Sequence, residues 1–459
     1  MSYKLACNLA CHAIANIFKI LGLLGLLFFL NSSSILADNL GNLHQECQPK
    51  IIEVTSGVYV AVGNTRAHIT LIEGDNGVII VDTGDNIAAA ERVITQFQNI
   101  TQKPIAAIIY THSHYDHTGG TRAFLNGDRT PIYARANFQA GGVKDNKLEP
   151  IDRDRTSFQH GTFIDPKEII AVNKTWCKLP IKNGGDGFVP PNHRFTQERV
   201  SLNIAGIALE LVAAPGETDD QLYVWLPDKK VLLCGDNYYR AFPNLYSIRG
   251  SYRDVKQWVH SLDKIIGEAP EYLISGHSLP ITGEEKIKRI ITDYRDGIDS
   301  IFEQTLTGMG RGLTPEELVA VVKLPPELAT KPYLQENYGN IPWTVRGIYN
   351  HYLGWFDGNP THLFPLSTRE NATRISRLVG GKEKLWQVAQ NAFTAEDYQW
   401  TLELTDYLLA LGFQTGAVKE LKAETLKSLA QKETNGNAKH YYLSIAQKLQ
   451  HHSKILLND

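Results

Sequence analysis

The stretch Thr111–Gly120 reads THSHYDHTGG and decides the fold. It follows directly on Ile105 to Tyr110, an apolar run typical of a buried strand. Its glycines allow a tight turn into the next helix. Three imidazoles and one carboxylate within six positions are ligands that zinc takes in roughly tetrahedral sites, and burying them unpaired would be costly. We therefore expect two zinc ions at this strand end. The expected ligands are His112 and His114 for one ion, and Asp116 and His117 for the other.

Around this stretch, strand signals dominate up to about residue 284. β-branched runs broken by turns rich in Gly and Asn predict strands, and a helical period predicts one helix. The expected strands are 51–60, 68–73, 77–81, 105–110, 204–212, 222–226, 230–233 and 271–275, and the helix is 87–98. The polar residues 140–196 are expected to form long loops over the active face. This order predicts an α/β fold, a sandwich of two mixed sheets with helices outside.

Beyond about residue 284, strand signals end and long helices are expected. Thr314–Glu317 forms a capping-box pattern with proline at the first helical position. From Lys382 onward, apolar residues recur at helical spacing, as in Leu385, Val388 and Ala392. These stripes predict an all-α region of stacked antiparallel helix pairs.

Length, charge and the N-terminus bound the class of protein. The 459 residues exceed what one domain usually holds, so two folded units are expected. A net charge of −3 argues against a nucleic-acid partner, which would require a basic excess. Lys4 and Lys19 precede the apolar run Ile20–Leu30, a layout typical of a signal peptide over residues 1–37, cleaved after Ala37. That run is short for a membrane span, and an uncleaved anchor is the alternative. We expect a periplasmic or secreted protein with no membrane contact after cleavage.

Cleavage at this position leaves three cysteines, without a CxxC pair or an even framework. Disulfides are therefore not expected to be the main source of stability. One bridge is possible in an oxidising compartment. The sequence does not decide whether, or how, Cys47, Cys177 and Cys234 pair.

The metal stretch resembles the signature of a known superfamily. HxHxDH after a strand is the metal motif of the metallo-β-lactamase superfamily, and VDTG at 81–84 is similar to its earlier strand-end motif. The resemblance implies an αββα sandwich over residues 38–284. It also implies that Asp82 orients the metal loop, because hydrogen-bonded partners fix the orientation of metal ligands.

Three later strand ends match the remaining ligand positions of that superfamily. Glu217 stands where most members have histidine, and this resembles the alkyl sulfatase branch, although a surface acid is the alternative. Asp236 matches the bridging carboxylate, where that branch favours glutamate, and His277 matches the last histidine. The implied sets are His112, His114 and Glu217 for one zinc, and Asp116, His117 and His277 for the other, with Asp236 bridging. Two zinc ions can share a water whose pKa falls toward neutrality, which makes hydrolysis the expected reaction class.

The segment Asn244–Gly250, NLYSIRG, resembles the Asn-Leu-Tyr-x-x-Arg-Gly segment of the alkyl sulfatases. The resemblance implies that Arg249 binds sulfate, and a guanidinium suits this role because it can donate to two sulfate oxygens at once. Tyr246 of the same segment is a second expected substrate-binding residue, and Asp236 and Arg249 are the expected catalytic residues. A surface salt-bridge arginine is the alternative for Arg249.

Further along, YLGWFDGNP at 352–360 is nearly the signature of the helical dimerisation domain of this branch. It implies an all-α dimerisation domain over residues 285–455 and a homodimer. Longer alkyl sulfatases also carry a third domain that resembles sterol-carrier proteins. The sequence up to Asp459 shows no such domain, which puts a preference for long alkyl chains in doubt.

These observations predict a zinc-dependent hydrolase that cleaves alkyl sulfate esters to an alcohol and inorganic sulfate with a metal-activated water. The resemblance implies cleavage of the carbon–oxygen bond. Two alternatives remain open at this point. One is a hydrolase of another ester, a thioester or a lactam, and the other is a binding protein that keeps a relic of the site.

Overall fold

The computed structural model describes residues 48–455, apart from 126, 128–129, 140–146, 163, 165–186 and 251. The expected signal peptide and two of the three remaining cysteines, Cys47 and Cys177, lie outside the described residues. Cys234 is buried and forms no disulfide with another described residue. The chain from Pro49 onward forms one compact unit. No described helix is both long enough and apolar enough to cross a bilayer.

Two mixed β-sheets form the first part of this unit. Within the described residues, one sheet has seven strands in the order β1 to β7, and the other has six in the order β13-β12-β11-β10-β9-β8. The first sheet consists of β1 (Lys50–Thr55), β2 (Val58–Val62), β3 (Ile69–Glu73), β4 (Val78–Val81), β5 (Ile105–Ile109), β6 (Ile132–Arg135) and β7 (His193–Phe195). The second consists of β8 (Arg199–Ile204), β9 (Ile207–Ala213), β10 (Leu222–Leu226), β11 (Val231–Gly235), β12 (Tyr272–Ser275) and β13 (Ile281–Thr282).

Side-chain alternation along the strands builds three apolar layers. In β4, Ile79 and Val81 face the second sheet and contribute to the core between the sheets. Val78 and Ile80 point the other way, toward the helix α2 (Ile87–Gln98). This period of two is the ordinary geometry of a strand that is buried on both faces.

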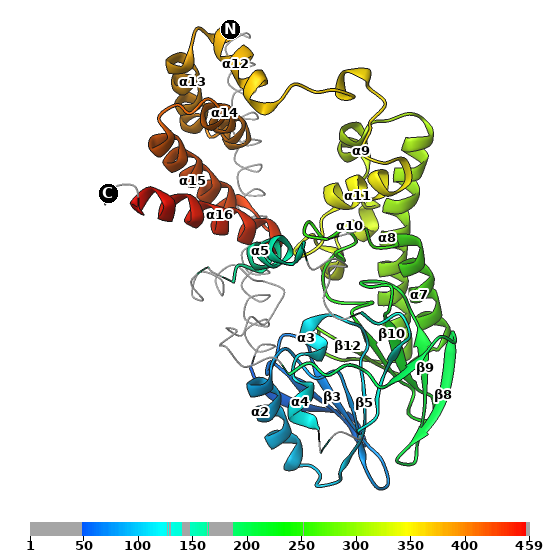
Figure 1. The fold of residues 1–459 in the computed structure, drawn as a ribbon. Coiled ribbons are helices and arrows are strands. Elements are labelled where there is room, and N and C mark those ends of the chain that lie inside the picture. The colour runs from blue at the N-terminus through cyan, green and yellow to red at the C-terminus, as the bar shows by residue number, and fades with distance from the viewer. Residues whose placement is uncertain are drawn as a thin grey trace, which may run out of the picture. The chain divides into compact units, whose positions relative to one another are not determined.

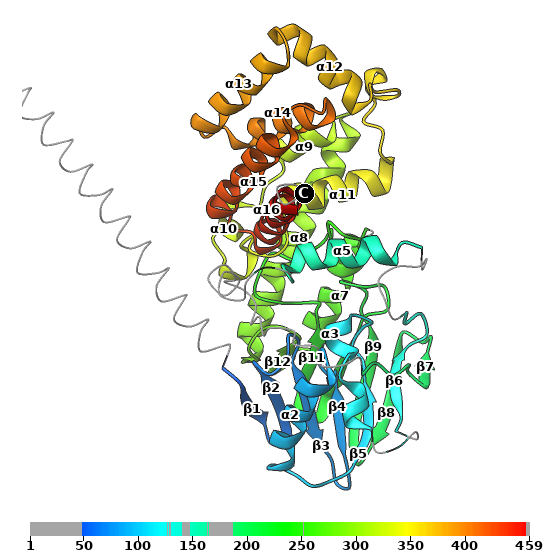
Figure 2. The same ribbon diagram turned by 60° about the vertical axis from the view of Figure 1, so that its left-hand side comes forward.

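Helices cover the outer face of each sheet, as Figures 1 and 2 show. The first sheet is covered by α2 and the short helix α4 (Thr121–Phe124). The second packs against α7 (Val255–Gly267) and α8 (Glu284–Gly310). The fold is therefore an αββα sandwich, which confirms the predicted fold class.

The chain from α8 to its end is helical. Its elements are α8, α9 (Pro315–Val321), α10 (Pro326–Ala329), α11 (Ile341–Leu353), α12 (Thr368–Val379), α13 (Lys382–Thr394), α14 (Tyr398–Ala410), α15 (Thr415–Lys432) and α16 (Gly436–Ile455), with short 3-10 turns at Pro332–Leu334 and Pro360–His362. The predicted capping box at Thr314 is present at the start of α9. The predicted apolar stripe packs as expected, because Leu385, Leu404 and Val418 meet in one buried cluster between α13, α14 and α15.

Three local predictions were wrong. Residues 51–60 are not one strand, because Gly57 with a φ of +76° turns the chain into the β1–β2 hairpin. Residues 204–212 are interrupted in the same way at Ala205–Gly206, where both φ angles are positive, as hairpin turns require. Of the region 140–196 predicted as loops, residues 140–146, 163 and 165–186 lie outside the described residues, and the rest contains the helix α5 (Glu149–His160) and the strand β7. The sequence of α5 is polar and gives little helical pattern, and its partner is a distant element, α16.

Candidate metal centre

The metal loop, residues 111–117, is held by Asp82. β4 and β5 run parallel, so Asp82 and the metal loop leave the first sheet at the same edge. Thr111 donates to the Asp82 carboxylate through its backbone N–H and its hydroxyl, each at 2.8 Å. His117 donates from Nδ1 to the same carboxylate at 2.7 Å. The other ring nitrogen of His117 therefore faces Asp236, whose Oδ2 lies 3.4 Å from it.

Three further side chains come from strand ends in the second sheet. Glu217 lies shortly after β9, Asp236 directly follows β11, and His277 lies shortly after β12. His277 donates from Nδ1 to the backbone carbonyl of Arg66 at 3.0 Å. Its Nε2 is thereby aimed at Asp236, at 3.0 Å from Oδ2. Strand ends of both sheets thus meet at the metal loop.

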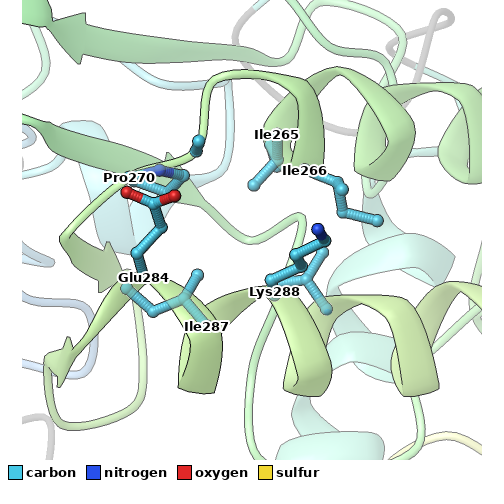
Figure 3. Close-up of a pocket in the computed structure, with 8 residues that line it drawn as sticks. Ile265, Ile266, Pro270, Glu284, Ile287 and Lys288 are labelled. Atoms are coloured by element: carbon cyan, nitrogen blue, oxygen red, sulfur yellow. The ribbon is translucent and has the colours of Figure 1, made fainter.

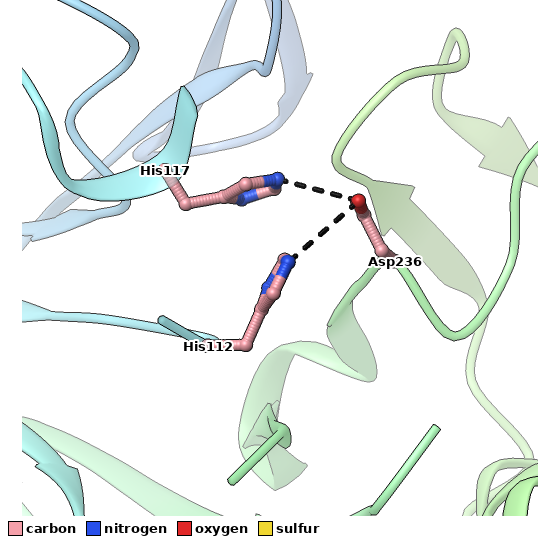
Figure 4. A group of neighbouring side chains, drawn as sticks. All are labelled: His112, His117 and Asp236. Atoms are coloured by element: carbon pink, nitrogen blue, oxygen red, sulfur yellow. Dashed lines mark ion pairs between the residues drawn. The ribbon is translucent and has the colours of Figure 1, made fainter. Parts of the chain in front are cut away.

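All seven residues predicted as metal ligands meet there. Their ligand atoms fall into three groups, and within each group they lie within 4.8 Å of one another. Figure 4 shows one group, in which Nε2 of His112 and of His117 lie 3.8 and 3.4 Å from Oδ2 of Asp236. The groups are His112, His117 and Asp236; Asp116, His117 and His277; and His114, Glu217 and Asp236. Asp236 and His117 each belong to two of these groups, so the three groups form one continuous cluster.

Burial sets the protonation of two of the histidines. It lowers the pKa of His112 well below its ordinary value, with nearby His117 adding to the effect. Burial also lowers the pKa of His114 to about 3, and the guanidinium groups of Arg253 and Arg249 contribute. Both imidazoles are therefore neutral at physiological pH, which is the form that can bind a metal. The ring nitrogens His112 Nε2 and His114 Nδ1 lie 3.0 Å apart.

Nearby carboxylates raise the pKa of the other two histidines, His117 and His277. Burial would lower the pKa of His117, but the charges of Asp236 and Asp82 raise it well above its ordinary value. The pKa of His277 is raised in the same way, by Asp236 against burial. Burial opposes ionisation of Asp236, yet His277 and His117 hold its pKa well below the usual range. Positive charge is thus favoured between these carboxylates.

The buried atoms left over at this place fit a metal ion. Glu217 Oε2, Asp236 Oδ1 and His117 Nε2 are buried and have no hydrogen-bond partner within the described part of the chain. Buried polar atoms are normally satisfied, and two carboxylate oxygens with one imidazole nitrogen are ligands that zinc accepts. The donor set therefore fits divalent zinc.

Arg253 is a buried cation that the sequence analysis missed. Its Nη1 lies 2.7 Å from Glu217 Oε1 and donates to the backbone carbonyl of Asn244 at 2.8 Å. Only 7% of its surface is exposed. It precedes Asp254, which caps α7, and that sequence signal explains only the helix start. Burial raises the pKa of Glu217 to about 7, and Arg253 counteracts this by favouring the ionised form.

The segment Asn244–Gly250 adds two buried hydrogen-bond donors. Arg249 Nε and Asn244 Nδ2 are buried without a hydrogen-bond partner among the described residues. The positive charge of Arg249 contributes to the lowered pKa of His114, after burial and Arg253, so Arg249 acts electrostatically on the metal loop. Asn244 was quoted in the sequence motif, but no role was predicted for it.

Tyr246 lies differently from its neighbours in that segment. Its ring packs against α11, where a Cβ placed on Gly347 would lie 2.6 Å from the ring. Tyr246 and Tyr252 also form an isolated antiparallel bridge. The geometry places this ring in the packing between the segment and α11, and its expected role in substrate binding stays a prediction.

A separate hollow between α7 and α8 is not a competing site. It measures about 60 Å³ and is lined by four isoleucines together with Ala269, Pro270, Glu284 and Lys288 (Figure 3). None of the described groups of metal-capable side chains lies there.

Comparison with known families agrees with this geometry. Residues 62–277 match the family model described as metallo-beta-lactamase superfamily, and this range runs from the end of β2 through β12 and includes all seven metal-capable side chains. Residues 314–452 match the model described as alkyl sulfatase dimerisation. The chain therefore combines a metallo-β-lactamase sandwich with an alkyl-sulfatase-type helical region.

Individual relatives narrow the class further. A linear primary-alkylsulfatase of a Pseudomonas species is 34% identical over 83% of this chain and 73% of its own length. An (R)-specific secondary-alkylsulfatase of Pseudomonas is 30% identical over 87% of this chain, which spans 62% of that relative. The solved structure of a stereoselective inverting sec-alkylsulfatase from Pseudomonas superposes with a TM-score of 0.81 at 29% identity, covering 90% of this chain and 67% of the other.

The chain belongs to the alkyl sulfatase family of the metallo-β-lactamase superfamily. This confirms the family predicted from the metal motif and from the YLGWFDGNP segment. The domain boundaries set by sequence at residues 38, 284 and 285 stay predictions.

Proposed function

We propose that this protein hydrolyses alkyl sulfate esters to an alcohol and inorganic sulfate, and that it uses two zinc ions. One observation supports this most directly. Seven metal-capable side chains converge on one place, and the segment that contributes the buried N–H donors Arg249 Nε and Asn244 Nδ2 is tied to Glu217 through Arg253. A sulfate monoester needs both features, since its anion requires donors and its hydrolysis requires a nucleophile.

The proposed ligands are divided between the two ions as the family resemblance implies. His112, His114 and Glu217 would hold one zinc, Asp116, His117 and His277 the other, and Asp236 would be shared. When bound, the two ions would supply a nucleophile at neutral pH by lowering the pKa of a water molecule.

The remaining residues of the site would bind the sulfate group and orient the metal ligands. Arg249 Nε and Asn244 Nδ2 would donate to the sulfate oxygens, because both are buried donors for which the described residues offer no acceptor. Hydrogen bonds between a cation and an anion are the strong class. Arg253 would hold Glu217 in place through its 2.7 Å ion pair. Asp82 would hold His117 and the metal loop.

The test is sulfate release from short-chain and long-chain alkyl sulfates by an Arg249→Ala variant. We expect kcat/KM to fall about 10- to 100-fold, the range for a lost hydrogen bond to a charged group, with zinc content unchanged. Arg311→Ala is the matched control, because Arg311 is exposed at the end of α8. Unchanged sulfate release in the Arg249 variant would contradict the assignment.

A panel of substrates tests the reaction itself. The same zinc-loaded protein would be offered alkyl sulfates, a carboxylic ester, a thioester and a β-lactam. We expect turnover of the sulfates alone. Hydrolysis of one of the others without sulfate release would overturn the proposed substrate and leave the metal centre unaffected.

We also propose a homodimer formed through the helical region. The segment 352–366, which links α11 and α12, exposes 70% of Trp355 and 93% of Phe364. Large apolar side chains grouped on a surface often mark an interaction site. The match to the dimerisation model covers this segment, which supports a second copy of the chain as its partner.

For localisation we propose the periplasm or the exterior of the cell, on the basis of the N-terminal pattern. N-terminal sequencing of the mature protein would test this. A start at Asp38 is expected, and a retained Met1 in the exported protein would contradict cleavage.

A further inference from the structure

The corner between α15 and α16 holds a loop that comes from far away in the sequence. Asn435 is almost completely buried, and its Nδ2 lies within hydrogen-bond distance of three backbone carbonyls of the loop 336–339, at 2.8 to 3.1 Å. Asn437 donates to the carbonyl of Tyr338 at 2.9 Å, and Gly436 N–H donates to the carbonyl of Asn337 at 2.8 Å. The corner therefore fixes the backbone of this loop.

The loop 336–339 in turn lies against the start of the segment Asn244–Gly250. The ring of Tyr338 meets the ring of Tyr239 edge to face, with centroids 5.5 Å apart. The Tyr239 hydroxyl accepts from the backbone N–H of Asn244 at 2.7 Å. Gly339 N–H donates to the carbonyl of Phe242 at 2.9 Å. Burial and the Glu217 carboxylate raise the pKa of Tyr338, which agrees with its place beside the metal centre.

A second connection runs from α16 through α5. His440 donates from Nδ1 to the backbone carbonyl of Gln159 at 3.0 Å. The side chain of Gln159 accepts from the Ser247 hydroxyl at 3.3 Å. All three residues are buried. Figures 1 and 2 both show α5 lying beside α16, and Phe158 packs edge to face on Tyr441 with ring centroids 5.6 Å apart.

The two connections meet the same segment at two points, at Asn244 and at Ser247. Arg249 lies shortly beyond the second point. An anion site depends on donors that are held within a fraction of an ångström of their working positions, because a small displacement weakens every bond to the ligand. The start of α16 therefore contacts Tyr338 and Gln159, the two residues that hold the segment carrying these donors.

We infer that Asn435 and His440, at the start of α16, are positioning residues that hold the sulfate-binding segment Asn244–Gly250 in place through Tyr338 and Gln159. This inference rests on the proposed function for the identity of the anion. It gives the helical region a part in substrate binding, in addition to the proposed part in dimerisation.

The variants are chosen to separate positioning from folding. His440→Leu removes the donor and keeps an apolar body, whereas His440→Asn places an amide N–H near the position of Nδ1 and should restore the bond. Asn435→Ala removes the contacts to the loop 336–339. Gln450→Ala is the matched control, because Gln450 lies toward the other end of α16 and its side chain donates to the exposed Glu424 at 3.2 Å.

The first measurement is hydrogen–deuterium exchange of the zinc-loaded protein. We expect faster exchange of the peptide that contains 244–250 in His440→Leu and Asn435→Ala, with the peptide that contains 111–117 unchanged. His440→Asn and Gln450→Ala should behave like the unaltered protein. Unchanged exchange of 244–250 in both disrupting variants would overturn the inference, whatever the protein hydrolyses.

The second measurement is inhibition by inorganic sulfate together with steady-state kinetics. We expect the inhibition constant and KM to rise about three- to tenfold in the disrupting variants, the range for one buried hydrogen bond, with kcat and zinc content nearly unchanged. A parallel loss of kcat, zinc and thermal stability would show a structural role only and would contradict positioning. If the unaltered protein releases no sulfate from any ester, the proposed function fails, and the exchange experiment still decides the positioning.

Discussion

Asp82 carries the metal loop at the cost of a strained backbone. Its φ is +56°, the left-handed region that L-residues other than Asn and Asp seldom enter. Strain of this kind persists only where the surroundings fix it. Here the carboxylate accepts hydrogen bonds from Thr111 and His117, so one side chain orients both the loop backbone and a ring nitrogen.

We expect Asp82→Asn to weaken zinc binding about 10- to 100-fold, the usual effect of removing the hydrogen-bonded partner of a metal ligand. Asparagine tolerates the same backbone conformation, so the change tests the carboxylate and not the strain. Competition with a chelator of known affinity would measure it, and Asp228→Asn, at an exposed turn, is the control. Equal zinc affinity in the Asp82 variant would show that the carboxylate is dispensable.

The same residues show which parts of the site can be read from a sequence. His112, Asp236 and His277 each follow a strand signal closely, so their convergence could be predicted from order along the chain. Arg253 could not, because its importance comes from Glu217 and Asn244, which approach it only in the folded chain. The burial of Asn244 Nδ2 away from any acceptor in the described part of the chain is likewise a property of the folded structure.

At the scale of elements, the sandwich was predictable and its long-range contacts were not. Strand periodicity is local, so β4 and β5 were found with nearly correct ends. α5 was missed because its polar sequence has no clear apolar face, and its helix is packed against α16, which comes nearly 300 residues later. The contact between the loop 336–339 and the segment Asn244–Gly250 also leaves no periodic signal.

That contact depends on the absence of a side chain at Gly339. A Cβ placed there would overlap the backbone carbonyl of Pro243. We expect Gly339→Ala to destabilise the protein by about 1–3 kcal/mol, the range for inserting a methyl group into a packed region, and to raise KM for sulfate esters. Thermal unfolding and steady-state kinetics measure the two effects.

Gly310→Ala is the control for this substitution, because a Cβ on Gly310 would meet no atom within 4 Å. The same melting temperature and KM in both variants would mean that the loop 336–339 can move away from Pro243 without consequence.

At the scale of the whole molecule, metal removal should lower stability. A ligand that binds only the folded chain stabilises it by about 2.7 kcal/mol at 100 times its Kd. We therefore expect a chelator to lower the melting temperature by about 3–6 °C, and added zinc to restore it. Glu217→Gln should shrink this shift, whereas Arg249→Ala should keep it. A melting temperature that changes with neither chelator nor zinc would contradict a contribution of the metal centre to stability.

The proposed homodimer can be tested at the segment 352–366. Exposed side chains as large as Trp355 and Phe364 would be unfavourable in a protein that stays monomeric, and stable interfaces bury such aromatic side chains at their centres. We expect a Trp355→Ser, Phe364→Ser double variant to shift the mass in solution from two chains to one, as measured by light scattering over a dilution series. Val321→Ser, an exposed apolar residue on α9, should leave the mass at two chains. A double variant that stays dimeric would place the interface elsewhere. If the unaltered protein is monomeric, the proposed homodimer is contradicted. The positioning contacts of α16 would still stand, because they lie within one chain.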